Sequence, residues 1–103
     1  MNIIAIRLDN LDQLPPEEQA FMVATMKVCE SIICDMTRLT AIVHKRLPDW
    51  KDMTSRVAKD FPEWLIQKRE MFYDPESVNQ FLADLVLWTR DRTEHHLGVE
   101  RQS

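Results

Sequence analysis

The chain has 103 residues, of which 45% are hydrophobic and 29% are charged, and its formal net charge is −4. These values exclude a disordered or fibrous protein, and the length fits one domain with a modest core. The charge is spread along the chain without a basic block, so nucleic acid is not expected as a partner. No apolar run approaches the roughly 20 residues of a membrane span, and the start does not read as a signal peptide.

The glycine content is the strongest indication of fold class. The chain has one glycine, Gly98, whereas sheet proteins of this size need several for hairpin turns and bulges. Helices joined at proline-marked corners need none. We therefore expect an all-α fold, a bundle of about four helices with one long central helix, in a single domain covering residues 1–103.

The first fourteen residues are predicted to form a short N-terminal arm. Ile4, Ile6 and Leu8 alternate with other residues, which is the period of a strand. No second strand-like segment follows to pair with them. The arm is expected to pack against the helices, with pairing to its own copy in a second subunit as the alternative, and strand or coil stays open for residues 2–8.

The first predicted helix is long and covers residues 16–46. Pro15 and Pro16 precede two glutamates, which is typical of a helix start, and Pro48 ends the helix. Its apolar residues occupy an arc about 160° wide, wider than on an ordinary surface helix. The helix spans roughly 45 Å, against a diameter of roughly 34 Å for a domain of this size. We therefore expect a homodimer in which a second subunit covers the projecting apolar surface; a helix interrupted midway is the alternative.

Prolines at the expected helix boundaries and a capping aspartate predict the helices that follow the long helix. Asp74, Pro75 and Glu76 form the clearest start signal in the chain, and Gly98 is placed to end the last helix. The predicted ranges after the long helix are 49–61, 62–73 and 75–97, followed by a tail at 98–103.

The two cysteines, Cys29 and Cys34, are five residues apart within the long helix. That spacing separates them by roughly 140° around the helix axis, which is too far for a disulfide. Reduced cysteines and the lack of an export signal lead us to expect a cytoplasmic protein.

No pattern in the sequence names a reaction. One glycine excludes a P-loop, a dinucleotide-binding motif and a nucleophile elbow. A metal-dependent hydrolase would have to use Asp84, Asp91 and His95. The spacing of Asp91 and His95 supplies two ligands on one helix face, and zinc needs three or four. We therefore expect neither an enzyme nor a cofactor.

Several surface residues are candidates for contact with a partner. Lys27, Arg38 and Lys45 are separated by small residues on the back of the long helix, which would let an acidic partner approach closely. A solvated stripe of good helix formers is the simpler explanation of the same pattern. Trp50, at a helix start beside charged neighbours, and Leu87, opposite the apolar face of the last helix, are the other candidates.

These features favour a non-catalytic protein-binding module, either an adaptor or an inhibitor that occludes or dismantles a partner assembly. Small acidic helical proteins with no catalytic motif are often inhibitors or immunity proteins encoded by phages, plasmids or toxin operons, which is a class-level expectation. The alternative is a helical nucleic-acid-binding regulator that uses Arg38, Lys45 and Arg46, or the bases around Arg90 and Arg92. The metal-dependent hydrolase is the second alternative.

Overall fold

The computed structural model describes residues 15–99, apart from the side chains of residues 72 and 73. The predicted N-terminal arm and residues 100–103 of the tail lie outside the described residues. Within residues 15–99 the chain is all-helical, as predicted, with three α-helices where about four were expected. The elements are α1 (Pro16–Val43), the short 3-10 helix η3 (Leu47–Asp49), α2 (Trp50–Tyr73) and α3 (Val78–Leu97). None of the helices described is long and apolar enough to cross a membrane.

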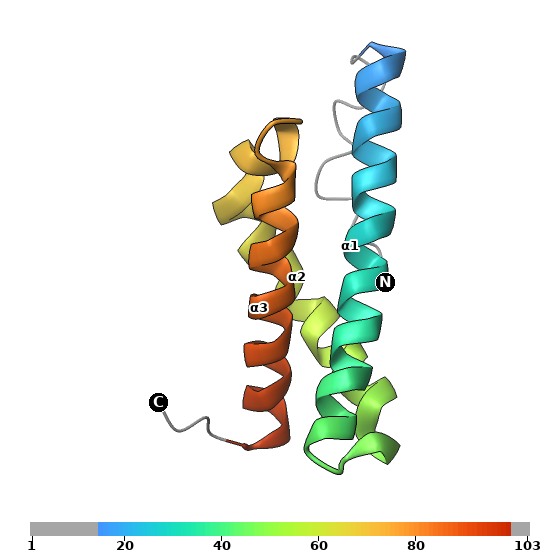
Figure 1. Cartoon of the computed structure of the whole chain (residues 1–103), viewed down its shortest axis with the longest axis vertical. Coiled ribbons are helices and arrows are strands. Elements are labelled where there is room, and N and C mark those ends of the chain that lie inside the picture. The colour runs from blue at the N-terminus through green and yellow to red at the C-terminus, as the bar shows by residue number, and fades with distance from the viewer. Residues whose placement is uncertain (1–14, 100–103) are drawn as a thin grey trace.

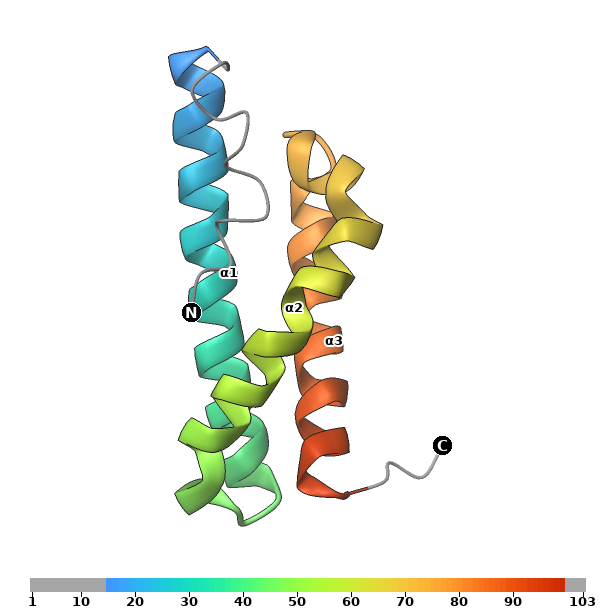
Figure 2. The ribbon, with the colours of Figure 1, turned by 180° about the vertical axis from the view of Figure 1, so that it is seen from behind.

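The three helices form two layers. α1 and α3 lie side by side, and α2 runs diagonally across the back of both (Figures 1 and 2), so that each helix packs against the other two. The molecule measures 45 × 26 × 18 Å. The 28 residues of α1 span about 42 Å, and its first turns extend beyond the ends of α2 and α3 (Figure 1). On the side away from α2, no described helix covers the α1–α3 pair (Figure 1).

α1 starts where predicted, at Pro16, but it ends at Val43 rather than at residue 46. Lys45 adopts a left-handed conformation with φ of 58°. The N–H of Lys45 donates to the carbonyl of Ile42 (3.0 Å), and the N–H of Arg46 donates to the carbonyl of Ala41 (2.7 Å). These two bonds close a Schellman motif, which usually has glycine at the left-handed position. Because the residue at this position is a lysine, no glycine in the sequence indicated where α1 ends.

The predicted helices 49–61 and 62–73 are not separate elements, and together they form the single helix α2 with Pro62 inside it. Proline lacks the N–H for one backbone hydrogen bond and its ring crowds the preceding turn, so it usually ends or kinks a helix. α2 continues because one buried apolar face runs through the proline at four-residue spacing. That face consists of Met53, Val57, Phe61 and Leu65.

The connection to α3 is held by Asp74. Its carboxylate accepts hydrogen bonds from the hydroxyl of Ser77 (2.7 Å) and the N–H of Glu76 (3.1 Å). These two bonds hold the pKa of Asp74 below its usual value. They form a turn at residues 75–77, so α3 begins three residues later than predicted. Its end falls where predicted, with Gly98 in the left-handed conformation (φ 76°).

The core lies where the three helices meet. An aromatic cluster joins α2 to α3: the ring of Trp64 is 5.3 Å from that of Phe81 and 5.3 Å from that of Trp88, measured between centroids. α1 contributes the other side of the core with Met22, Met26, Cys29 and Ile33. Burying each large side chain of this kind contributes about 1.5–3 kcal/mol.

Candidate protein-binding surface

Only part of the wide apolar arc of α1 is covered by the other helices. Next to the buried part runs a row of apolar residues that we call the α1 stripe. Their spacing of three and four residues places them on one side of the helix. Exposure along the stripe reaches 51% at Leu39 and 67% at Val43. The members of the α1 stripe are Val28, Ile32, Met36, Leu39 and Val43.

The C-terminal half of the α1 stripe projects into solvent. Ile42 and Leu47 are also exposed at this end of α1, and η3, which contains Leu47, packs against α1. Elsewhere, Ile66 of α2 and Leu87 of α3 are exposed to a similar degree, 51% and 50%, but neither has another exposed large apolar residue one turn away on its helix. Isolated exposed residues are ordinary, whereas a grouped set marks an interaction surface.

The N-terminal half of the α1 stripe lines a hollow between α1 and α3. The hollow has a volume of about 360 Å³, and Val86 forms its α3 wall. Two charged side chains, Lys27 and Asp35, stand at its edge. The predicted contact residue Lys27 therefore lies beside an apolar hollow, although the sequence pattern had placed it on the back of the helix.

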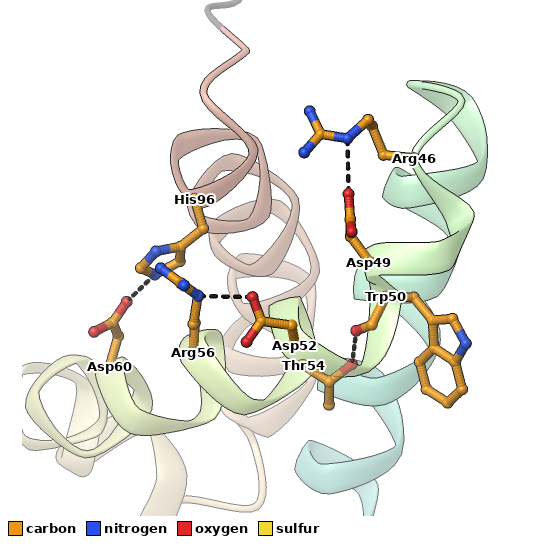
Figure 3. Close-up of polar contacts among 8 residues, drawn as sticks. All are labelled: Arg46, Asp49, Trp50, Asp52, Thr54, Arg56, Asp60 and His96. Carbon is orange, nitrogen blue, oxygen red and sulfur yellow. Dashed lines mark hydrogen bonds and ion pairs between the residues drawn. The ribbon is translucent and has the colours of Figure 1, made fainter.

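Arg38 and Trp50, which are distant in the sequence, are brought together by the turn between α1 and α2. The guanidinium of Arg38 lies 4.2 Å from the centroid of the Trp50 ring, and its Nη2 is 3.9 Å from the Sγ of Cys34. Trp50 is half-buried rather than exposed. Figure 3 shows its indole on the outer side of the start of α2, away from the contact of His96 with Asp60.

The other predicted contact residues do not join this pair. Lys45 lies beyond the end of α1, in the left-handed turn. Leu87 is exposed on α3 at a distance in sequence from any other exposed large apolar residue. The predicted cationic stripe is also interrupted, because Ala41 is fully buried.

Two sets of polar contacts tie the end of α3 to the other helices. The Nε2 of His44 is 2.7 Å from the Oε2 of Glu94. The Oδ2 of Asp60 lies 2.7 Å from both the Nε of Arg92 and the Nε2 of His96 (the latter in Figure 3). Partial burial raises the pKa of Asp60, but the hydrogen bonds from Arg92 and His96 outweigh this effect and hold it below the usual value.

A larger hollow, of about 490 Å³, lies between α2 and α3. Its walls include the stacked rings of Trp64 and Trp88, with Asp60 and Arg92 at the polar side. Of the three charged residues in the lining, Asp60 and Arg92 are already paired with each other, and Glu63 is the third. The pair of Asp60 and Arg92 in its wall therefore has a structural role, because it joins α2 to α3.

The two carboxylates proposed as metal ligands, Asp84 and Asp91, each pair with a different neighbour. Asp84 accepts a hydrogen bond from Gln80 (2.8 Å) and lies 3.6 Å from the Nζ of Lys68. Asp91 pairs with the neighbouring Arg90. Among the residues that the structure describes, no three His, Cys, Asp or Glu side chains come together as a group that could hold a metal ion.

The buried cysteine is a poor nucleophile in this setting. Cys29 is completely buried in the core. Burial raises the pKa of its thiol to about 12, so the reactive thiolate is scarce at neutral pH.

Three of the five basic residues proposed for nucleic-acid binding are paired with acids; Arg38 and Lys45 are not among them. Arg46 lies 2.8 Å from Asp49 (Figure 3), and Arg90 lies 3.3 Å from Asp91. Arg92 is held by an aspartate of α2. Pairs of this kind neutralise the charge that contact with phosphates would require.

Comparison of the sequence with models of protein families and with curated proteins finds no match, and neither does comparison of the fold with solved structures.

Proposed function

We propose that this chain is a non-catalytic protein-binding module, an adaptor or an inhibitor, whose contact surface is the α1 stripe. The observation that carries the proposal is the exposure of grouped apolar side chains on the C-terminal half of the stripe, which reaches 67% at Val43. Exposed apolar groups of this kind gain free energy when a partner removes them from water.

The bound element is an amphipathic helix. The hollow beside the N-terminal half of the α1 stripe lies between α1 and α3, and no described helix covers the α1–α3 pair on the side away from α2 (Figure 1). A helix placed there would complete a four-helix arrangement, with apolar residues at three- and four-residue spacing in the groove. Lys27, Asp35 and Arg38 would provide the polar border of this contact.

Affinity capture from lysate of the native host, with three forms of the chain, tests the proposal. The wild type and a control carrying Ile66→Glu and Leu87→Glu should retain the same protein in near-stoichiometric amount. A variant carrying Leu39→Glu and Val43→Glu should lose it. All four positions are about half exposed or more, so the variants carry the same added charge at similarly exposed sites. Equal retention by all three forms would contradict the proposal.

A further inference from the structure

The spacing of the α1 stripe is self-complementary when a second α1 lies antiparallel to the first. Two pairs of stripe residues then face one another, and both are symmetric about a single point between Thr37 and Arg38. One two-fold axis at that point therefore places four of the five residues of the stripe opposite another residue of the stripe. The facing pairs are Met36 with Leu39 and Ile32 with Val43.

The two halves of the surface also differ in shape in a complementary way. The half that contains Leu39 and Val43 projects into solvent. The half that contains Val28, Ile32 and Met36 lines the hollow of about 360 Å³. The two-fold arrangement sets the projecting half of each copy against the hollow of the other. Both hollows are filled at once, as in an isologous interface, where the same patch serves on both subunits.

The charges at the edge of the stripe match the same arrangement. The side chain of Asp35 is exposed and makes no hydrogen bond or ion pair with any described residue. Arg38 is exposed on the same flank of α1, stacked on Trp50. In the antiparallel pair, the position that faces Asp35 of one copy is two residues away from Arg38 of the other copy. Two residues correspond to about 3 Å along the helix axis. The two-fold axis creates this acid–base contact twice.

We propose that the helix bound by the α1 stripe is α1 of a second copy of this chain, in an antiparallel and two-fold symmetric dimer. The inference rests on the proposed function, because it assigns an occupant to the same surface. The second copy supplies the helices that the open side of the α1–α3 pair lacks, and the result is a closed dimer with no free apolar stripe. A helix from another protein would compete with the second copy for this surface.

Sedimentation velocity of the full chain over a range of concentrations is the first test. The wild type is expected to sediment as a dimer at micromolar concentrations. Val43→Glu should weaken the dimer about 100-fold, because the two-fold axis places each substitution in the interface twice and each contributes roughly a tenfold loss. Ile66→Glu, at a position of comparable exposure on α2, should leave the dimer unchanged. Circular dichroism should show the same helix content for all three.

A charge exchange tests the register. Asp35→Arg and Arg38→Asp should each weaken self-association several-fold, because each places like charges across the axis. In an equimolar mixture of the two variants, one chain carries arginine at both positions and the other carries aspartate at both. Each of the two contacts across the axis then joins an arginine to an aspartate. The mixture should therefore form a heterodimer close to wild-type strength.

Three results would overturn the inference: a wild type that is monomeric at high micromolar concentration, a Val43→Glu dimer as strong as the wild type, or a charge-exchange mixture that stays monomeric. A monomeric wild type whose captured partner is still lost on stripe substitution would leave the proposed function in place. It would assign the groove to a different protein. If deletion of residues 1–14 turned a monomer into a dimer, the groove would instead belong to the chain's own N-terminal segment.

Discussion

Arg38 of α1 and Trp50 at the start of α2 are in direct contact, with the guanidinium carbon 4.2 Å from the centroid of the indole ring. The contact stabilises the turn between α1 and α2, which lies at the exposed end of the α1 stripe. A cation over a tryptophan ring at a partly exposed site contributes about 0.5–1 kcal/mol. The pair therefore makes a small contribution to holding the two helices in one relative orientation.

Arg38→Leu is expected to lower the free energy of unfolding by about 0.5–1 kcal/mol, because the stacked cation is lost while apolar bulk is kept. Urea denaturation of Arg38→Leu, Trp50→Leu and the double variant measures the interaction as a double-mutant cycle. A coupling energy indistinguishable from zero would mean that the contact contributes nothing to stability.

Lys45→Gly is expected to raise the free energy of unfolding by about 0.5–1 kcal/mol. The left-handed backbone of Lys45 (φ 58°) strains any residue with a Cβ by about 1–2 kcal/mol, and part of the gain is offset by the greater freedom of glycine in the unfolded chain. Lys45→Ala is the matched control, since it removes the charge but keeps the Cβ, and it should show no such gain in thermal or urea unfolding.

Gly98→Ala is expected to act in the opposite direction and lower the free energy of unfolding by about 1 kcal/mol. An added Cβ at Gly98 would meet nothing within 4 Å, so the loss isolates the strain of its left-handed conformation (φ 76°). An unchanged midpoint of thermal unfolding would show that the end of α3 relaxes without cost.

Thr89→Val is expected to stabilise the chain by about 1 kcal/mol. Thr89 is fully buried, and its Oγ1 is buried without a hydrogen-bond partner among the described residues. An apolar group of the same shape removes that desolvation penalty. Thr37→Val is the control and should destabilise, because the hydroxyl of Thr37 bonds to the carbonyls of Ile33 and Cys34. Equal effects of the two variants on urea midpoints would contradict this account.

Asp60→Asn is expected to lower the free energy of unfolding by about 1 kcal/mol near neutral pH. The pKa of Asp60 in the folded chain lies below the usual 3.8 because the hydrogen bonds from Arg92 and His96 outweigh the effect of partial burial. The ionised carboxylate therefore adds stability above pH 3.8, and that stability is lost as the pH falls through the folded pKa. The free energies of unfolding of the wild type and of Asp60→Asn, measured against pH, should converge as the pH becomes acidic. A difference that grows in acid would contradict the assignment.

The helix starts and the all-helical class follow from local signals in the sequence. Pro16 with its following glutamates starts α1, Asp74 orders the turn before α3, and Gly98 ends α3. Each of these effects involves a residue and its close neighbours along the chain. They can be read from the sequence because the interactions that produce them act within about one helical turn.

The departures from prediction have tertiary causes. Pro62 was expected to separate two helices, but Phe61 and Leu65 are both fully buried on the same face of α2, and their packing carries the helix through the proline. Lys45 ends α1 without glycine because η3 and α2 fold back against α1. Packing free energy distributed over several distant residues outweighs a local preference of about 1–3 kcal/mol in both cases.

The sequence by itself determined that α1 is long, apolar over a wide arc and longer than the domain is across. It could not determine which part of the arc is covered, because a helical pattern gives the angle of each residue and not the direction from which a neighbour approaches. Only the tertiary structure decided that Ile33 is buried in the core while Leu39 and Val43 are left in water. The same packing placed Trp50 beneath Arg38, since a contact across a chain reversal depends on the path of both helices.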